Sequence, residues 1–261
     1  MCLNFRNNRM VKTVLEFTAS PSLPRMAVFY AWSNICSAEW IVVQGVVFDI
    51  DGTIIDSVDL HIESWKRAFQ QFGKECSYEP IRRQIGKGAD EFLAMFFSRE
   101  ELGRVRGDLE KYRRELFKRE YLPKAKAFPR VRELFERIKR DGRKIALAST
   151  AKEEEIKIYK EIARIDDLVD AVACSEDVEH SKPHRDICSA AVQKLGNIAP
   201  ERVIAVGDTR FDAEAAGKIK VRTIGLLCGG GNREELHQAG CIAIYKDPAD
   251  LLEQYRCSPL Q

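Results

Sequence analysis

The chain lacks any apolar stretch of the ~18 residues that a transmembrane helix requires, so we expect no membrane interaction. It also lacks an excess of charge of one sign: 42 Lys and Arg residues stand against 40 Asp and Glu residues, a net charge of +2. This balance gives no reason to expect a nucleic acid partner. With 261 residues, 45% of them hydrophobic and 31% charged, the sequence is typical of a globular protein with one large core or two unequal cores.

CxxC pairs, the usual sign of a thiolate metal site, are absent although the chain has eight cysteines. Four of these, Cys174, Cys188, Cys228 and Cys241, lie in or near apolar runs. A disulfide scaffold would be expected in a much shorter secreted chain. We therefore predict free, mostly buried thiols and a reducing, cytoplasmic location.

A clean hydrophobic period is missing from residues 1–43. The short apolar run near Met26 has neither a basic leader nor a clear cleavage site, and is a poor secretory signal. We interpret residues 1–43 as a loosely attached N-terminal extension of uncertain structure, with Met26 as a candidate for a later start.

From Gly45 onward, short apolar runs alternate with helical patterns. A buried strand over 46–48 precedes a helical insert, whose first helix carries an apolar face that begins at Val58 and Ile62. Strands alternating with helices predict an α/β fold with a parallel sheet covered on both faces. The predicted core spans 44–56 and 129–261, and the predicted cap 57–128. Later strands are expected at 144–148, 171–173, 203–206, 223–226 and 242–244.

The most informative stretch is Asp49-Ile50-Asp51-Gly52-Thr53, directly after the first buried strand. In an open α/β sheet, ligands bind beyond the carboxyl ends of the strands. Two carboxylates at that position indicate a nucleophile, an acid/base pair or metal ligands. An ordinary turn, with Asp and Gly as turn formers, is the alternative.

Three further polar signals follow later strands. Ser149-Thr150 at a helix start could cradle an anion, although Ser and Thr are also common N-caps. The lysine of Ser181-Lys182-Pro183 can neutralise phosphate charge, or be an ordinary surface lysine. Asp208 can bind a hard cation such as Mg²⁺, whereas Asp212 can also cap the next helix. Because all of them fall at or just beyond predicted strand ends, we expect one composite site.

With these motifs in this order, residues 45–257 resemble the haloacid dehalogenase superfamily, and most closely its phosphoglycolate phosphatase and β-phosphoglucomutase branch. The resemblance implies a Rossmann-like three-layer core with a parallel sheet and an inserted all-helical cap, which agrees with the insert seen above. The motifs that carry the resemblance are Asp49-Ile50-Asp51-Gly52-Thr53, Ser149, Lys182-Pro183, and Gly207-Asp208 with Asp212.

The resemblance also implies a role for each motif residue. Asp49 would be the nucleophile that forms an aspartyl-phosphate. Asp51 would protonate the leaving oxygen and then activate water. Ser149, with Thr150 beside it, and Lys182 would hold the transferring phosphoryl group.

A Mg²⁺ cofactor follows from the same resemblance. Its ligands would be Asp49, the backbone carbonyl of Asp51, and Asp208. Asp212 would support Lys182 or the metal from the outer shell, and Gly52-Thr53 would shape the turn between core and cap.

Substrate choice is expected in the cap. In mutases of this branch a histidine matching His61 faces the acid/base aspartate, but phosphatases can carry it too, and a structural hydrogen bond is the alternative. Lys87, in a Gly-Lys-Gly loop that resembles the cap substrate loop, would meet a distal anionic group or simply be exposed. Trp65 is interpreted as core, and Lys152 as a residue that flanks the site.

Together these features predict a Mg²⁺-dependent phosphatase that acts on a small phosphorylated metabolite. Asp51 favours phosphoryl transfer over dehalogenation, because dehalogenases deliver no proton to the halide and lack this second aspartate. A sugar-phosphate mutase is the first alternative, and a phosphate-binding protein without turnover is the second. We expect a monomer or weak homodimer that binds neither nucleic acid nor membrane.

Overall fold

The computed structural model describes residues 42–178, 180, 182 and 184–261. The predicted N-terminal extension therefore lies outside the described residues, except for its last two positions. Ser181 and Pro183 of the lysine motif also lie outside them. None of the helices in the described part of the chain is long and apolar enough to cross a membrane.

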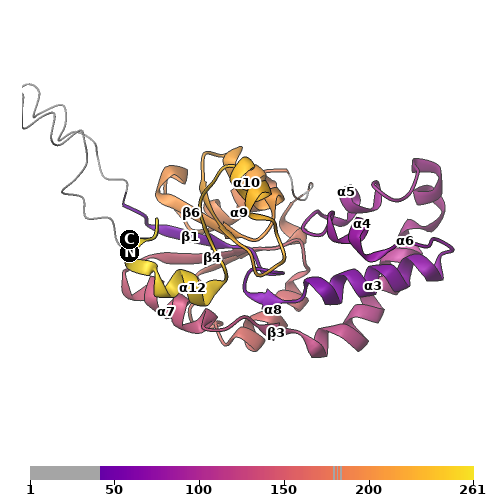
Figure 1. Ribbon diagram of the computed structural model, residues 1–261, viewed down its shortest axis with the longest axis horizontal. Coiled ribbons are helices and arrows are strands. Elements are labelled where there is room, and N and C mark those ends of the chain that lie inside the picture. The colour runs from indigo at the N-terminus through magenta and orange to yellow at the C-terminus, as the bar shows by residue number, and fades with distance from the viewer. Residues whose placement is uncertain (1–41, 179, 181, 183) are drawn as a thin grey trace, which may run out of the picture. The chain divides into compact units, whose positions relative to one another are not determined.

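Six parallel strands form the central sheet, in the spatial order β5-β4-β1-β6-β7-β8 (Figure 1). Near-continuous apolar runs suit such strands, because both faces of a parallel sheet are buried. The predicted α/β, Rossmann-like architecture is confirmed. The strands are β1 (Gly45–Phe48), β4 (Lys144–Ala148), β5 (Ala171–Ala173), β6 (Val203–Gly207), β7 (Arg222–Leu226) and β8 (Cys241–Tyr245).

Helices cover both faces of this sheet (Figure 1). Side chains of β1 alternate between the faces: Phe48 stacks on Phe135 at 4.6 Å between ring centroids, whereas Val47 packs in the cluster that contains Ile187. On the Phe135 face lie α7 (Val131–Arg140), α8 (Glu153–Ala163) and α12 (Pro248–Glu253); on the other lie α9 (Asp186–Lys194) and α10 (Arg210–Gly217). The shorter α11 (Arg233–Gln238) packs beside β8.

Two short antiparallel strands, β2 (Ile55–Asp56) and β3 (Lys126–Ala127), carry the chain out of the core and back. The segment between them is helical and has its own apolar cluster, which includes Phe69, Phe92 and Leu109. Its α-helices are α3 (Val58–Gln71), α4 (Tyr78–Arg82), α5 (Ala89–Leu93) and α6 (Arg99–Leu116), followed by a π-helical turn at Phe117–Tyr121 and a 3-10 turn at Leu122–Lys124. We call this segment the cap; the predicted cap boundaries, 57–128, remain a prediction.

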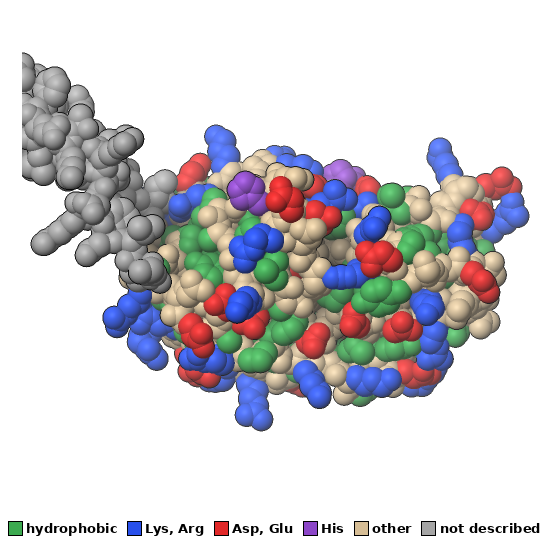
Figure 2. All heavy atoms as spheres, viewed as in Figure 1, with side chains coloured by type: hydrophobic (Ala, Val, Ile, Leu, Met, Phe, Trp, Pro, Cys, Tyr) green, Lys and Arg blue, Asp and Glu red, His purple; other side chains and the backbone are tan. Residues whose placement is uncertain are grey.

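Basic and acidic side chains are interspersed over the face of the molecule seen in Figure 2. Many of them form exposed pairs on helix surfaces, for example Arg104 with Glu100. Exposed pairs of this kind contribute little to stability. The visible face therefore offers no continuous basic surface of the kind that tracks a nucleic acid backbone.

Candidate active site

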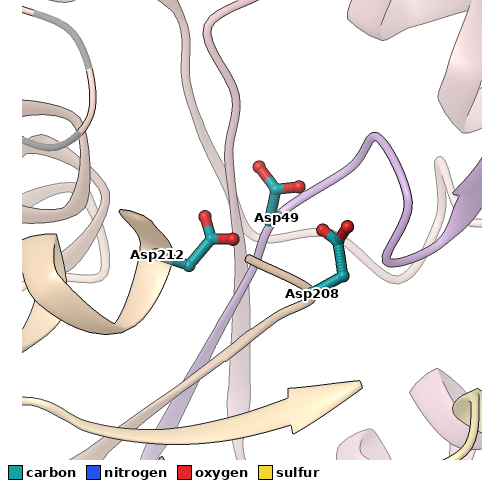
Figure 3. Close-up of side chains that lie close together, drawn as sticks. All are labelled: Asp49, Asp208 and Asp212. Atoms are coloured by element: carbon teal, nitrogen blue, oxygen red, sulfur yellow. The ribbon is translucent and has the colours of Figure 1, made fainter. Parts of the chain in front are cut away.

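Three carboxylates converge at the carboxyl edge of the sheet (Figure 3). Asp49 directly follows β1, Asp208 directly follows β6, and Asp212 lies in the first turn of α10. The register that pairs Phe48 with Val206 brings the first two to the same edge. One oxygen from each of the three carboxylates lies within 4.8 Å of the others. Carboxylate oxygens at this spacing form a donor set suited to a hard divalent cation.

The Asp212 carboxylate makes two kinds of contact at once. Its Oδ2 accepts hydrogen bonds from the Thr209 backbone N–H at 3.0 Å and the Thr209 hydroxyl at 2.6 Å. The first of these bonds, with the bond from the Asp212 N–H to the Thr209 hydroxyl oxygen at 3.4 Å, forms the capping box that starts α10. Its Oδ1 lies 2.6 Å from Lys182 Nζ. Both roles weighed for Asp212, as a helix cap and as a support for Lys182, are therefore compatible with its position.

Lys182 is held among oxygens and is almost fully buried. Its ammonium contacts Asp49 Oδ1 and Asp212 Oδ1, and donates to the carbonyl oxygen of Ala148 at 3.2 Å. An ammonium has three donors, so these contacts use all of them and fix its position. Burial opposes the charge, but the two carboxylates outweigh it and raise the pKa of Lys182 above its ordinary value.

The carboxylates outnumber the cations at this edge. Burial, with Asp212 and Asp51 nearby, raises the pKa of Asp49 to about 7 even though Lys182 opposes the shift. Burial and the charges of Asp212 and Asp49 likewise raise the pKa of Asp208 well above its ordinary value. The three acids share one buried lysine, so their donor set and its uncompensated negative charge both fit Mg²⁺.

Glycine backbone packs directly against the Asp208 carboxylate. A Cβ at Gly229 would lie 1.8 Å from Asp208 Oδ2, and one at Gly52 would lie 2.4 Å from the same oxygen. Gly52 also has a φ of +83°, a conformation that side chains rarely adopt. On the other side, the Thr53 hydroxyl donates to Asp208 Oδ1 at 3.1 Å. The sequence Asp51-Gly52-Thr53 thus determines the conformation of the turn and also holds the Asp208 carboxylate in place.

Asp51 faces away from the three acids and toward the cap. Its Oδ1 accepts a hydrogen bond from Ser57 Oγ at 2.5 Å and lies 2.7 Å from His61 Nε2. Burial would raise the pKa of Asp51, but the electrostatic attraction of His61 and the hydrogen bonds from His61 and Ser57 outweigh burial and lower it to about 2. The two aspartates of the first motif therefore have opposite electrostatic environments.

Arg113 of α6 lies behind His61, and the sequence analysis did not identify it. Its Nη2 contacts His61 Nδ1, and its guanidinium carbon lies 4.8 Å from the Trp65 ring centroid and 4.7 Å from that of Phe117. Guanidinium groups only donate hydrogen bonds, so Nδ1 accepts and Nε2 carries the proton that His61 offers to Asp51. Helical periodicity could not reveal this residue, because an arginine on an amphipathic helix usually faces solvent.

A cavity of about 350 Å³ lies between core and cap, with Asp49 and Asp51 in its wall. Of the other predicted residues, His61, Lys87, Thr150 and Lys152 line it, and so does Trp65 although its side chain is mostly buried in the cap core. Ser149 is not among the lining residues: it is buried, and its Oγ accepts a hydrogen bond from the Ala151 N–H at 3.1 Å.

The cap contacts the core at the catalytic edge. The Gly88 N–H donates to the carbonyl oxygen of Lys182 at 3.2 Å, and Arg82 contacts the carbonyl oxygen of Gly230. Lys87 Nζ lies 5.3 Å from the ring centroid of Phe211. The cap loop that contains Lys87 therefore closes over the residues that follow β6 and over the lysine loop.

Comparisons with known proteins find similar families, sequences and folds. A family model described as "Haloacid dehalogenase-like hydrolase" matches residues 46–226. A phosphorylated carbohydrates phosphatase of Thermotoga maritima is 27% identical over 215 residues, which are 80% of this chain and 96% of that protein. A phosphoglycolate phosphatase of Shigella dysenteriae is 27% identical in an alignment 237 residues long, which covers 80% of this chain and 91% of that protein. The structure of a hydrolase from Pseudomonas syringae superposes with a TM-score of 0.72 at 27% identity, covering 82% of this chain and 98% of that one.

Proposed function

Because this chain belongs to the haloacid dehalogenase-like hydrolase family, we propose that it is a Mg²⁺-dependent phosphatase of small phosphorylated metabolites that works through an aspartyl-phosphate. The observation that carries the proposal is the buried contact of the Lys182 ammonium with Asp49 and Asp212, in one cluster with Asp208, because Asp49 of this cluster also lines the cavity between core and cap. A phosphate-sized anion needs concentrated positive charge around a nucleophile; Lys182 supplies part of this charge, and a bound Mg²⁺ would supply the rest.

Asp49 is the nucleophile in this proposal. Its carboxylate forms a bond to phosphorus while the bond between phosphorus and the leaving oxygen breaks. Lys182 holds Asp49 in position and stabilises charge on the transferring phosphoryl oxygens. Mg²⁺, held by Asp49, Asp208 and the Asp51 carbonyl, would supply the remaining positive charge that offsets repulsion between the carboxylate and the phosphate dianion.

Asp51 is the acid and then the base. It gives a proton to the leaving oxygen as the first bond breaks, and it takes a proton from the water that attacks the aspartyl-phosphate. The second step frees Asp49 and releases inorganic phosphate. General acid/base work of this kind contributes roughly 10²–10⁴-fold to rate. Ser57 and His61, both bonded to Asp51 Oδ1, hold the carboxyl in place for the two transfers.

The test is phosphate release from a panel that contains phosphoglycolate, sugar phosphates and an aryl phosphate, with and without Mg²⁺. We expect Mg²⁺-dependent release that disappears in Asp49→Asn, and a phosphoenzyme that accumulates or turns over slowly in Asp51→Asn. Unimpaired turnover in Asp51→Asn would contradict the acid/base assignment. A protein that binds phosphate without turnover would release nothing from any member of the panel.

A sugar-phosphate mutase remains the alternative, because it would use the same aspartyl-phosphate and return the group to a sugar. The contact between His61 and Asp51, at 2.7 Å, is compatible with either activity. The same panel distinguishes them: isomerisation of a sugar phosphate without free phosphate favours the mutase, and free phosphate favours the phosphatase.

A further inference from the structure

The cap wall of the cavity carries arginines, and one of them, Arg113, has no ion-pair partner among the described residues. On α6, Arg106, Glu110, Arg113 and Arg114 all line the cavity, and their spacing places them on one face of the helix. Arg106 is paired with Glu110, at 2.9 Å, and with Asp90. No carboxylate among the described residues forms an ion pair with Arg113.

Neighbouring side chains hold the Arg113 guanidinium in place, but they do not use all of its hydrogen-bond donors. Its Nε donates to Ser64 Oγ at 3.2 Å and its Nη2 contacts His61 Nδ1, but its Nη1 has no hydrogen-bond partner among the described residues. The Trp65 and Phe117 rings hold the group. Burial lowers the pKa of Arg113, which shows that its charge is only partly compensated by Glu155, Tyr159 and Asp51. A half-buried guanidinium with a free donor edge at a cavity is a ready partner for an anion.

The position of Arg113 limits the length of the ligand. The guanidinium lies one imidazole ring beyond the Asp51 carboxyl, so hydrogen-bond lengths put its donors on the order of 8 Å from that carboxyl. Asp51 protonates the leaving oxygen in the proposed mechanism, so this oxygen and an anion at Arg113 belong to one compact molecule. A long spacer between the two groups would not fit this separation.

We propose that Arg113 is a specificity-determining residue that binds a second anionic group of the substrate, so that the preferred substrates are short phosphorylated compounds carrying a carboxylate or a second phosphate. This inference rests on the proposed phosphatase function. The carboxylate and the second phosphate share the same chemistry at Arg113, and the experiment below separates them.

The test compares each compound that carries two anionic groups with a twin that lacks the second anionic group. Phosphoglycolate is paired with hydroxyethyl phosphate, and methylenebisphosphonate with methylphosphonate. Binding of all four is measured by calorimetry with Mg²⁺ on full-length Asp49→Asn, alone and combined with Arg113→Met, Arg113→Lys or Arg104→Met. Methionine keeps much of the stem that packs between the rings, and Arg104 is an exposed residue of the same helix, paired with Glu100.

We expect the member with two anionic groups in at least one pair to bind roughly 10- to 100-fold tighter than its twin, as a charge-assisted hydrogen bond predicts. Arg113→Met should abolish that ratio, Arg113→Lys should restore part of it, and Arg104→Met should leave it unchanged. The pair that responds identifies the carboxylate or the second phosphate. Equal binding of both twins in both pairs, or a ratio that survives Arg113→Met, overturns the inference.

Turnover by the wild-type enzyme separates this inference from the proposed function. If an aryl phosphate is hydrolysed but the twins bind equally, only the role of Arg113 is wrong. If no phosphate is hydrolysed, the phosphatase proposal is wrong, and the binding ratio still decides the role of Arg113. If Arg113 merely orients His61, Arg113→Met lowers kcat/KM by the same factor for phosphoglycolate and for hydroxyethyl phosphate. The ratio of the binding affinities of these two compounds then stays unchanged.

Discussion

Removal of Mg²⁺ should make the stability of this protein fall as pH rises, which is opposite to the usual behaviour of a protein with ion-paired carboxylates. Asp49 and Asp208 have raised pKa values, so in the folded protein they keep protons that the unfolded chain has already lost. The folded state then binds more protons than the unfolded state. Stability contributed by these groups is present below the unfolded pKa and is lost as pH rises through the folded pKa.

The magnitude follows from Asp49. Its pKa rises from 3.8 in the unfolded chain to about 7 in the folded protein. At about 1.4 kcal/mol for each pH unit, this difference corresponds to a loss on the order of 4 kcal/mol between about pH 4 and about pH 7. Asp208 adds to the loss in the same direction. The lowered pKa of Asp51, about 2, acts only in more acidic solution and does not cancel it.

Chemical unfolding of the metal-free protein between about pH 5 and about pH 8 measures this effect. We expect the free energy of unfolding to decrease toward pH 8, and Mg²⁺ to restore it most at that end, because a bound dication stabilises the ionised carboxylates. Asp208→Asn is the informative variant. It should flatten the pH dependence, stabilise the metal-free protein near pH 8 and abolish the gain from Mg²⁺. A metal-free protein whose stability is flat or rises over this window would refute the charge assignment.

Three other changes test separate parts of the structure. Gly229→Ala places a Cβ against the Asp208 carboxylate, so Mg²⁺ affinity measured by calorimetry should fall roughly tenfold or more; unchanged affinity would mean that Asp208 is not a ligand. His61→Ala removes the interaction with His61 that lowers the pKa of Asp51, so the limb of the kcat/KM profile that reports Asp51 should move to higher pH, and an unmoved limb would contradict the pairing. Arg143→Met removes a buried guanidinium that donates to two backbone carbonyls and to two side chains. The free energy of unfolding, measured by chemical denaturation, should fall by about 3 kcal/mol while kcat stays unchanged. A lower kcat with an unchanged free energy of unfolding would contradict this structural role.

Much of the fold could be predicted from the sequence because parallel strands produce short apolar runs. The expected strands over 144–148 and 171–173 match β4 and β5 to the residue, and the other predicted strands differ from theirs by one residue at one end or at both. Two features had too little pattern to be found. Strands β2 and β3 have two residues each, too few to show alternation. Helix α12 is six residues long, although Asp247 and Pro248 at its start are typical N-terminal signals.

The site was harder to predict wherever function depends on a partner far along the chain. Asp49 and Asp208 could be found because each directly follows a predicted strand. Arg113 could not, since its contact with His61 joins residues 52 positions apart on two cap helices. At Ser149 the sequence motif predicts a hydroxyl that binds phosphate. In the structure its Oγ accepts a hydrogen bond from the local backbone, and the neighbouring Thr150 lines the cavity instead.

The opposite pKa shifts of Asp49 and Asp51 bear on the chemistry itself. Near neutral pH a pKa of about 7 leaves a large fraction of Asp49 protonated, whereas Asp51, whose pKa is about 2, is ionised. Nucleophilic attack needs the reverse, an ionised Asp49 and a protonated Asp51. A dication held between Asp49 and Asp208 favours loss of the first proton, and a phosphate dianion beside Asp51 favours gain of the second. We therefore expect proton release when Mg²⁺ binds and proton uptake when a phosphate substrate binds.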